Sequence, residues 1–424
     1  MSVAPELDLS RIPFWGQPRA QRLEAFRRLR ELDRPVFLPE DKIPFLPHGR
    51  GFYALVRHAD VSEASRNAGV FSSEPTSNSI PDMPRWLALY FGSMINMDDP
   101  RHARLRRIVS RAFTPRVLAK MEEDLQRAAE EIVDRAVKEG PGDFVPQIAA
   151  KLPVQVICDM IGIPPKFHGM VLSRTNTILA NADSEYSGFG VNYARPEARP
   201  SRWATARGLI KLLQAGHELS ALAQRLGRER RLNPTGDLTS LLVNGDERLT
   251  TQELGSFFIL LVVAGSETTR NAISHGLKAF TDNPGQRELL MSDFEKYIPG
   301  AVEEIIRYST PVIQFRRTLA RDHTMNGMDY KKGDKVLLFY NSANRDEAVF
   351  VDPDVFDITR APNPHVGFGG PGPHYCLGAH LARREITVMF RELFTRMPEI
   401  RVEGEPSYLL SNFINGIKHM RFRF

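Results

Sequence analysis

The stretch that decides the fold is NPHVGFGGPGPHYCLGAHLARR, residues 363–384, where a glycine- and proline-rich segment changes abruptly into a helix-like run. Cys376, one of only two cysteines in the chain, stands at that junction, eight positions after Phe368. The free N–H groups at a helix N-terminus lower the pKa of a thiol and favour the thiolate. A thiolate held there suits a metal or a nucleophilic reaction. Cys158, inside the apolar run VICDMIG, is instead predicted to be a buried hydrophobe.

Three kinds of site compete for Cys376. GFGGPG, residues 367–372, matches the dinucleotide fingerprint, but no clear strand leads into it and too little chain follows for a nucleotide-binding unit. A zinc site would combine Cys376 with His374 and His380, and it lacks a paired motif to complete four ligands. The third possibility is the axial ligand of haem iron, where a single thiolate suffices and favours cleavage of the O–O bond.

Length and composition describe an ordinary globular chain. The 424 residues are 42% hydrophobic, which is enough for a large core, and we expect residues 1–424 to form one domain because no linker or repeat divides them. No apolar run approaches the ~20 residues of a membrane span, so no transmembrane anchor is expected. The N-terminus lacks a signal-peptide pattern and two cysteines are too few for a disulfide scaffold, which predicts a cytoplasmic protein. A net charge of +5 is weak evidence for nucleic acid, and none is expected as a partner.

The order of the patterns predicts a mainly α-helical fold with a small β portion. Apolar residues at spacings of three and four predict helices over residues 102–138 with a break at Thr114-Pro115, and over residues 154–162, 251–280 and 294–308. Strands are expected at residues 51–56, 315–320 and 327–340. Residues 71–100 read as a long ordered loop with one short helix, and residues 181–202 as a mobile cover.

The helix expected over residues 251–280 carries polar side chains in apolar surroundings. FFILLVVAG, residues 257–265, is apolar on every face and predicts a fully buried helix that begins at a capping pattern from Thr250. Glu267 and Thr268 follow. A buried carboxylate beside a hydroxyl can relay protons through water, which is the favoured interpretation because an isolated glutamate is costly to bury. A simple ion pair between Glu267 and a base is the alternative.

Several cations fit the needs of a haem, which carries two propionates. His102 and Arg106 lie four residues apart, on one face of an expected helix. Arg317 and His374 are further donors from other segments. These four residues could therefore hold anionic groups from more than one side.

Taken in this order, the motifs resemble cytochrome P450, a family of haem-thiolate monooxygenases, over nearly the whole chain. The motifs that carry the resemblance are FGGPGPHYCLG at 368–378, AGSETT at 264–269, EIIR at 304–307, DPRHARLR at 99–106 and ANRDE at 343–347. The resemblance implies a triangular prism of about a dozen helices around a buried haem b.

The resemblance also implies a role for each motif residue. Cys376 is implied as the proximal metal ligand, with Phe368 against the haem near the sulfur. Glu267 and Thr268 are implied as the catalytic residues of proton delivery. The propionate contacts are implied to be His102, Arg106, Arg317 and His374, and the structural network to be Glu304 and Arg307 with Arg360 as a possible third member.

The loop between Phe368 and Cys376 is one residue longer than in most bacterial members. This length resembles an actinobacterial subgroup that hydroxylates methyl-branched lipids, with relatives that act on sterol side chains. The resemblance implies terminal hydroxylation of a methyl-branched fatty acid or isoprenoid; a steroid side-chain hydroxylase and a non-catalytic haem protein are the alternatives. The implied substrate-pocket positions are all apolar: Ile95, Leu260, Val263, Ala264, Ile313, Phe315, Phe413 and Ile414. For any single one of these residues, core packing is an equally good explanation.

An arginine-rich run, residues 101–116, indicates how electrons reach such a site. The resemblance places this run and the segment after Cys376 beside the proximal face, where a small acidic protein would be attracted. The arginines expected there are Arg104, Arg107, Arg111, Arg383 and Arg384. Because the chain has no flavin or reductase domain, a ferredoxin with its ferredoxin reductase is the expected electron donor.

Overall fold

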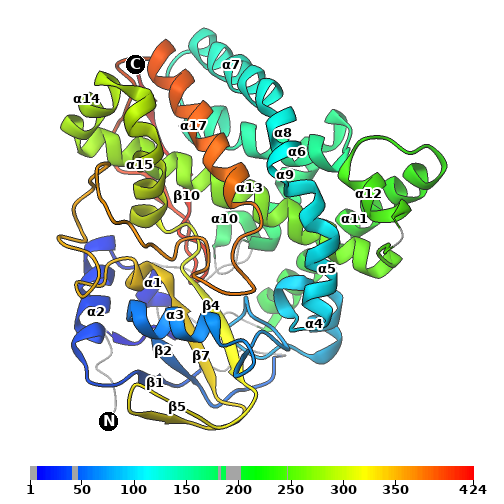
Figure 1. Cartoon of the computed structure of the whole chain (residues 1–424), viewed down its shortest axis with the longest axis vertical. Coiled ribbons are helices and arrows are strands. Elements are labelled where there is room, and N and C mark those ends of the chain that lie inside the picture. The colour runs from blue at the N-terminus through cyan, green and yellow to red at the C-terminus, as the bar shows by residue number, and fades with distance from the viewer. Residues whose placement is uncertain (1–6, 41–45, 180–182, 188–201, 246) are drawn as a thin grey trace.

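Helices make up most of the chain, and a small sheet lies at one end beside α2 and α3 (Figure 1). The computed structural model describes residues 7–40, 46–179, 183–187, 202–245 and 247–424. The expected fold class, mainly α with a small β portion, is confirmed. The helices are α1 (Ile12–Trp15), α2 (Arg19–Glu31), α3 (His58–Arg66), α4 (Arg85–Tyr90), α5 (Arg101–Ser110), α6 (Pro115–Lys120), α7 (Glu122–Glu139), α8 (Lys151–Ile161), α9 (His168–Leu179), α10 (Ser184–Ser187), α11 (Arg202–Leu232), α12 (Leu238–Asn244), α13 (Thr251–Asp282), α14 (Pro284–Ser292), α15 (Phe294–Ser309), α16 (Tyr340–Ala343) and α17 (Ala379–Arg396).

The main sheet has five strands in the order β1-β2-β7-β4-β3. Its members are β1 (Val36–Leu38), β2 (Phe52–Leu55), β3 (Phe71–Ser72), β4 (Gln314–Leu319) and β7 (Lys335–Phe339). Within this sheet only the β2–β7 pair is parallel. The strands expected at residues 51–56 and 315–320 are present as β2 and β4, and the region expected over residues 327–340 contains two strands, one of which is β7. The other strands form three two-stranded pairs: β5 (His323–Met325) with β6 (Met328–Tyr330), β8 (Arg401–Val402) with β11 (Phe422–Arg423), and β9 (Ser407–Tyr408) with β10 (Ile417–His419).

Helix α13 is the central element of the helical part and packs against α8, α9, α11, α15 and α17. Its start follows the expected capping box, because Thr250 Oγ1 accepts from the Glu253 amide at 3.2 Å and the Glu253 carboxylate accepts from the Thr250 amide at 2.9 Å. The expected break at Thr114-Pro115 is also confirmed, since Thr114 caps α6. The long helix thereby becomes α5, α6 and α7.

Residues 71–100 form the expected long loop, which contains β3, α4 and a 3-10 turn (Met94–Asn96). One buried arginine of the sheet, Arg316, fastens this loop: it donates to the Ile80 carbonyl at 3.2 Å and to Asp82 at 2.7 Å. The cover expected over residues 181–202 lies mostly outside the described residues, and the part inside them contains α10. Among the residues that the structure describes, no helix is long and apolar enough to cross a bilayer.

Candidate active site

Cys376 is held by a loop whose glycines adopt conformations that other residues avoid. Gly369, Gly370 and Gly372 have φ of 98°, 68° and 144°. The Cys376 amide donates to the Phe368 carbonyl at 2.9 Å, which closes the loop. A Cβ on Gly372 would lie 2.2 Å from the Ser65 carbonyl of α3, so the long loop packs directly against that helix. No strand precedes GFGGPG and α17 begins only at Ala379, so the dinucleotide interpretation is not supported.

The Cys376 thiol is accessible, yet it is surrounded by protein. Burial raises the pKa of this thiol, while the Gly378 amide and the cations Arg106 and Arg383 oppose that shift. The prediction that the helix N-terminus would lower the pKa is therefore wrong for the chain by itself, because desolvation outweighs these favourable contacts. An iron ion would reverse the balance, since metal binding deprotonates a thiol.

Phe368 lies beside this cysteine and is largely buried. The Arg383 guanidinium stands 4.4 Å from the centre of its ring. Arg383 is itself fixed by Glu303 at 2.5 Å, and Glu303 also contacts His365 at 2.9 Å. Phe368 is thus packed on one side by a cation that belongs to α17.

The four basic residues expected at the propionates are brought close together. The rings of His102 and His374 have centroids 4.2 Å apart, and Arg106 donates to the Tyr375 carbonyl at 2.7 Å. Burial lowers the pKa of His374 to about 3, and it also lowers the pKa values of His102, Arg106 and Arg317.

Two observations test whether this cluster fits an anionic cofactor. His102 Nε2 is buried and has no hydrogen-bond partner in the described part of the chain. The cations also depress one another, since Arg317, His102 and Arg106 each lower the pKa of His374 after burial itself. Carboxylates would satisfy the orphaned nitrogen and relieve the repulsion, so the residues fit the propionates of a haem.

One stripe of α13 is accessible although most of the neighbouring residues on the helix are buried. Leu260, Val263 and Thr268 are partly exposed and Ala264 is exposed, at spacings of three and four that place them on one face. The prediction that residues 257–265 are buried on every face is therefore wrong for this stripe.

The other expected pocket residues come from three segments. Phe315 of β4 meets Phe413 edge to face with ring centroids 5.4 Å apart, and the Ile313 amide donates to the Phe413 carbonyl at 2.8 Å. Ile313 and Ile414 are fully buried, which fits core packing as well as a pocket wall. Ile95 is partly buried in the long loop. Phe315 and Phe413 are partly exposed, as is the stripe on α13.

Glu267 is buried and paired with a base, which is the alternative that the sequence disfavoured. Arg270, one turn further along α13, forms an ion pair with it, and both side chains are nearly inaccessible. Asn271 adds a hydrogen bond to the same carboxylate at 3.3 Å. Thr268 donates to the Ala264 carbonyl at 2.7 Å and remains partly exposed. A proton relay must therefore operate with Glu267 held in an ion pair.

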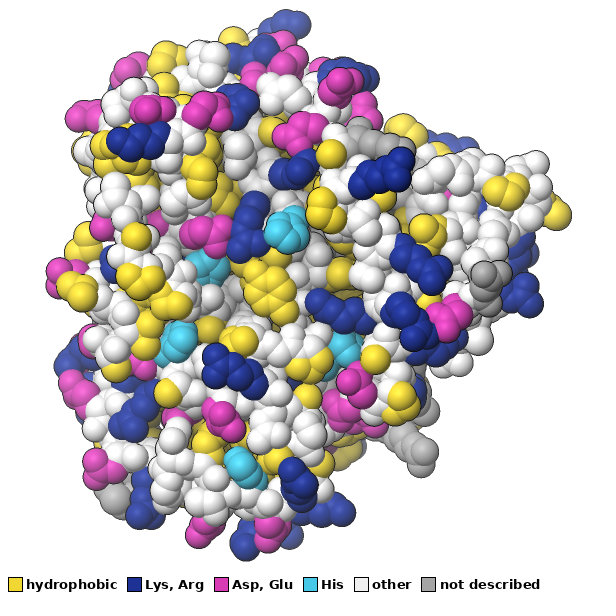
Figure 2. Space-filling model, in the orientation of Figure 1, with side chains coloured by type: hydrophobic (Ala, Val, Ile, Leu, Met, Phe, Trp, Pro, Cys, Tyr) yellow, Lys and Arg dark blue, Asp and Glu magenta, His cyan; other side chains and the backbone are white. Residues whose placement is uncertain are grey.

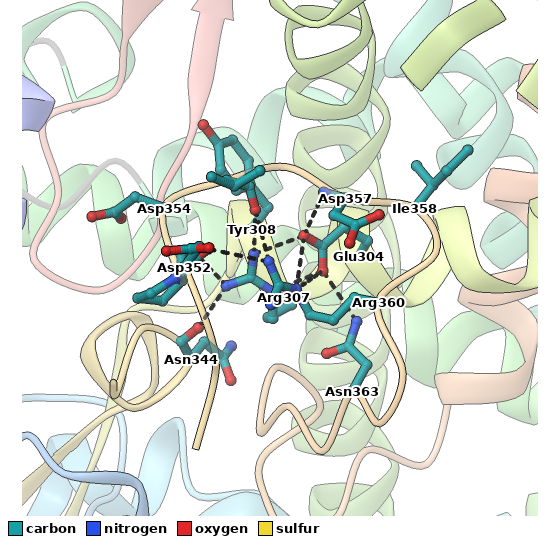
Figure 3. A network of polar contacts seen from close by, with 12 residues as sticks. Glu304, Arg307, Tyr308, Asn344, Asp352, Asp354, Asp357, Ile358, Arg360 and Asn363 are labelled. Atoms are coloured by element: carbon teal, nitrogen blue, oxygen red, sulfur yellow. Dashed lines mark hydrogen bonds and ion pairs between the residues drawn. The ribbon is translucent and has the colours of Figure 1, made fainter. Parts of the chain in front are cut away.

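Glu304 and Arg307 form the centre of a buried network (Figure 3). The guanidinium makes two 2.7 Å bonds to the carboxylate, and both side chains are 0% exposed. Arg360 is the third member, as expected, with its Nε 3.3 Å from Glu304. Arg307 also donates to three backbone carbonyls, those of Asn344, Pro353 and Val355, at 2.9, 2.7 and 3.1 Å. The network thus fastens the segment before the cysteine loop to α15.

The face that carries α3, α5 and the start of α17 has a hollow near its middle (Figure 2). Hydrophobic side chains form the floor of this hollow, and Lys and Arg side chains surround it. Most of the arginines expected here have carboxylate partners: Arg104 with Glu253 at 2.8 Å, Arg107 with Glu247 at 2.6 Å, Arg383 with Glu303 at 2.5 Å, and Arg384 with Glu122. Their positive charge is therefore partly compensated within the chain.

Sequence reasoning missed Arg270 and Asn271. The signal was available, because an arginine three residues after a glutamate in a helix predicted to be buried has an evident ion-pair partner. It also missed Ser73, whose hydroxyl lies 3.0 Å from His374 Nε2, and Asn176 of α9, which accepts from Arg270 at 3.0 Å. These last two contacts join segments far apart in the sequence, and no local pattern indicates them.

Comparisons with known proteins agree with this geometry. The family model described as Cytochrome P450 matches residues 214–397. The chain is 45% identical to a methyl-branched lipid omega-hydroxylase of Mycobacterium tuberculosis, covering 97% of this chain and 93% of that protein. It is 40% identical to a steroid C26-monooxygenase of Mycolicibacterium smegmatis, covering 87% and 83%. A Mycobacterium marinum cytochrome P450 solved in complex with pseudoionone superposes with a TM-score of 0.91 at 39% identity, covering all of both chains. The chain therefore belongs to the cytochrome P450 family, whose members bind haem b and act as monooxygenases.

Proposed function

We propose that the chain inserts one oxygen atom of O₂ into a terminal C–H bond of a methyl-branched fatty acid or isoprenoid. The observation that carries the proposal is the accessible Cys376, which lies close to the cations Arg106 and Arg383. When bound, a thiolate-ligated haem supplies O–O bond cleavage. The protein side chains around the haem would hold it, deliver protons and bind the substrate.

Cys376 would ligate the iron, with Phe368 and its stacked Arg383 on the proximal side. His102, Arg106, Arg317 and His374 would hold the propionates. The two histidines act as neutral donors, because burial lowers the pKa of each. Glu267 and Thr268 would pass protons from water to the site, since the Thr268 hydroxyl lies on the accessible stripe of α13.

An apolar lining supports a hydrocarbon substrate. The accessible stripe contributes Leu260, Val263 and Ala264, and the Phe315–Phe413 pair contributes aromatic surface. Pseudoionone, the ligand in the similar M. marinum structure, is itself a methyl-branched ketone. Steroid side-chain hydroxylation is the second candidate, favoured by the 40% identity to a steroid C26-monooxygenase.

The reduced carbon-monoxide spectrum tests the ligand. Wild-type protein should show the strongly red-shifted Soret band of a thiolate-ligated haem, and Cys376→Ser should lose it. Cys158→Ser is the matched control, because Cys158 is fully buried in α8 and burial raises the pKa of its thiol to about 12. Retention of the red-shifted band in Cys376→Ser would contradict the assignment.

Titration with a panel of branched fatty acids, isoprenoids and sterols tests the substrate. Binding that displaces water shifts the iron spin state, and mass spectrometry of the product then locates the new hydroxyl. Methyl-branched lipids should give the larger shift and a terminal alcohol. A shift with sterols alone would favour the second candidate.

Electron supply and location complete the proposal. A ferredoxin with its reductase would dock over the hollow of Figure 2, where Lys and Arg side chains gather. The rate at which the ferredoxin reduces the haem iron should fall as ionic strength rises, because salt screens the attraction between the two proteins.

A cytoplasmic location agrees with the two free cysteines, which suit a reducing compartment.

A further inference from the structure

Arg22, on α2, is a partly buried cation that has no role in the proposed function. Within the described part of the chain, its buried Nε has no hydrogen-bond partner. Burial lowers the pKa of Arg22 to about 10 and the neighbouring Arg19 lowers it further, whereas the Tyr408 hydroxyl opposes the shift. The guanidinium is still charged at neutral pH, so its desolvation is a cost that calls for a counter-ion.

Two further arginines meet at the end of α15, close to Arg22. Arg19 lies three residues before Arg22, on the same face of α2. Its guanidinium carbon is 4.7 Å from the centre of the Tyr308 ring, and it donates to the Tyr308 carbonyl at 3.2 Å. Arg345 approaches the same ring at 5.1 Å and donates to the same carbonyl at 2.7 Å. Burial lowers the pKa of Arg345 to about 9, and Arg19 lowers it further.

His275, on α13, lies within reach of the charges of all three arginines. Burial lowers the pKa of His275 to about 3, and the three arginines each lower it as well. Its Nε2 lies 2.9 Å from the Asn415 carbonyl and donates to it. This histidine therefore stays neutral and adds no charge of its own, but it shows that the three guanidiniums surround one region.

The described residues supply little negative charge to this region. Asp354 pairs with Arg345 at 3.1 Å, and its side chain is 68% exposed. The C-terminus of α15 contributes about half a negative charge through its free carbonyls. The first turn of α2 has no acidic residue and no side-chain cap, so the dipole of that helix adds about half a positive charge. The three arginines thus leave about two positive charges without compensation.

We propose that Arg19 and Arg22 bind one phosphate group at the start of α2, beside the end of α15. A phosphate monoester carries a charge of about −1.5 to −2 at neutral pH, which matches this excess better than the single charge of a carboxylate. Guanidinium groups hold phosphate oxygens through paired N–H donors. Free phosphate and the headgroup of a phospholipid offer the same group. The site uses none of the residues assigned to the haem or the substrate, so it is independent of the proposed function.

The first test is calorimetric titration of the holoenzyme with inorganic phosphate, against chloride at equal ionic strength. Wild type should bind one phosphate. Arg22→Gln should weaken this binding by about 10-fold to 100-fold, the value of a charge-assisted hydrogen bond. Arg11→Gln is the matched control, because Arg11 is exposed and precedes α1, and it should bind phosphate like wild type. No binding to wild type, or equal affinity in Arg22→Gln, overturns the inference.

Thermal unfolding separates a binding role of Arg22 from a structural one. Without phosphate, Arg22→Gln should melt no lower than wild type, because the substitution removes a charge that Arg19 repels. Phosphate should raise the melting temperature of wild type and of Arg11→Gln but not of Arg22→Gln, because a ligand stabilises the folded state that binds it. If Arg22→Gln melts lower in both buffers and phosphate leaves wild type unchanged, Arg22 is structural and the inference fails. If Arg22→Gln does not fold, Arg19→Gln removes the other donor, and unchanged affinity in that variant also overturns it.

Vesicles distinguish the two sources of the phosphate group. Phosphatidylcholine vesicles that contain phosphatidic acid should sediment wild type and Arg11→Gln more than Arg22→Gln if the site takes a lipid headgroup. Binding of inorganic phosphate without such a difference in sedimentation identifies a site for the free anion. A chain that binds neither probe at this position has no such site.

Discussion

Glu304→Gln tests whether the buried network of Figure 3 stabilises the fold. The substitution retains the shape of the side chain and removes its charge. Arg307 and Arg360 then lose their counter-ion, and the Asn363 amide and Asp357 backbone amide lose a charged acceptor at 3.1 and 3.0 Å. No water can replace the carboxylate around Arg307, which is 0% exposed.

The expected magnitude follows from this burial. Removing one member of a buried ion pair costs about 3 to 5 kcal/mol, because the remaining charge is left uncompensated. An unfolding entropy of about 2.1 cal/mol/K per residue gives about 0.9 kcal/mol/K for a chain of 424 residues. The melting temperature should therefore fall by about 3 to 6 °C.

Glu295→Gln is the matched control on the same helix. Glu295 pairs with Arg391, but it is 74% exposed, and an exposed pair contributes about 0 to 1 kcal/mol. Both variants should be measured as holoenzymes by calorimetry and by urea unfolding at one haem loading. Equal melting temperatures for Glu304→Gln and wild type would refute the reasoning, and so would an equal loss in Glu295→Gln.

A double variant separates the ion pair from the backbone contacts. Glu304→Met with Arg307→Leu removes both charges of the pair, which alone is often neutral or stabilising, although Arg360 then loses its contact with Glu304 just as it does in Glu304→Gln. Here three carbonyls would also lose their donor, at about 1 kcal/mol each. The double variant should therefore remain less stable than wild type by about 3 kcal/mol. A double variant as stable as wild type would show that the backbone contacts of Arg307 do not contribute to the stability of the fold.

Two further predictions concern the cysteine loop and the described part of the cover. Gly372→Ala should lower haem retention during gel filtration, because its Cβ would lie 2.2 Å from the Ser65 carbonyl at a φ of 144°. The control Gly285→Ala, where a Cβ meets nothing, should retain haem like wild type. His419 bonds Asp143 at 2.6 Å and Glu185 of α10 at 2.8 Å, and these carboxylates raise its pKa. The contact is then fully present below the ordinary pKa of about 6.5 and is lost as pH rises through the raised value. The protection of the α10 amides relative to their intrinsic exchange rate should therefore fall over that pH range in wild type and stay constant in His419→Gln.

The sequence predicts well those features that depend on local patterns. The capping box of α13 from Thr250 to Glu253, the break at Thr114-Pro115 and the strand after residue 314 all follow from side chains a few positions apart. The Glu304–Arg307 pair is of the same kind, because three residues separate its members on one helix turn. Such features need no knowledge of the distant chain.

Features set by distant contacts were the ones missed. The arginines expected to make a positive face are largely compensated, because Glu253, Glu247 and Glu122 reach them from other segments of the chain. Asn176 meets Arg270 across 94 positions of sequence. Without the tertiary arrangement, neither the partner nor the resulting charge can be known.

The two errors made at the active site have one physical cause. The N-terminal end of α17 was expected to lower the pKa of the Cys376 thiol, and Glu267 was expected to relay protons without a base beside it. The first expectation left out the burial of the thiol, and the second recognised that Glu267 is buried but did not identify the arginine that accompanies it. Desolvation raises the pKa of the Cys376 thiol above its ordinary value, and Glu267 is accommodated through Arg270. A charged group in the centre of this fold is thus stable only with its counter-ion: an arginine for Glu267 and, by the proposed function, an iron for Cys376.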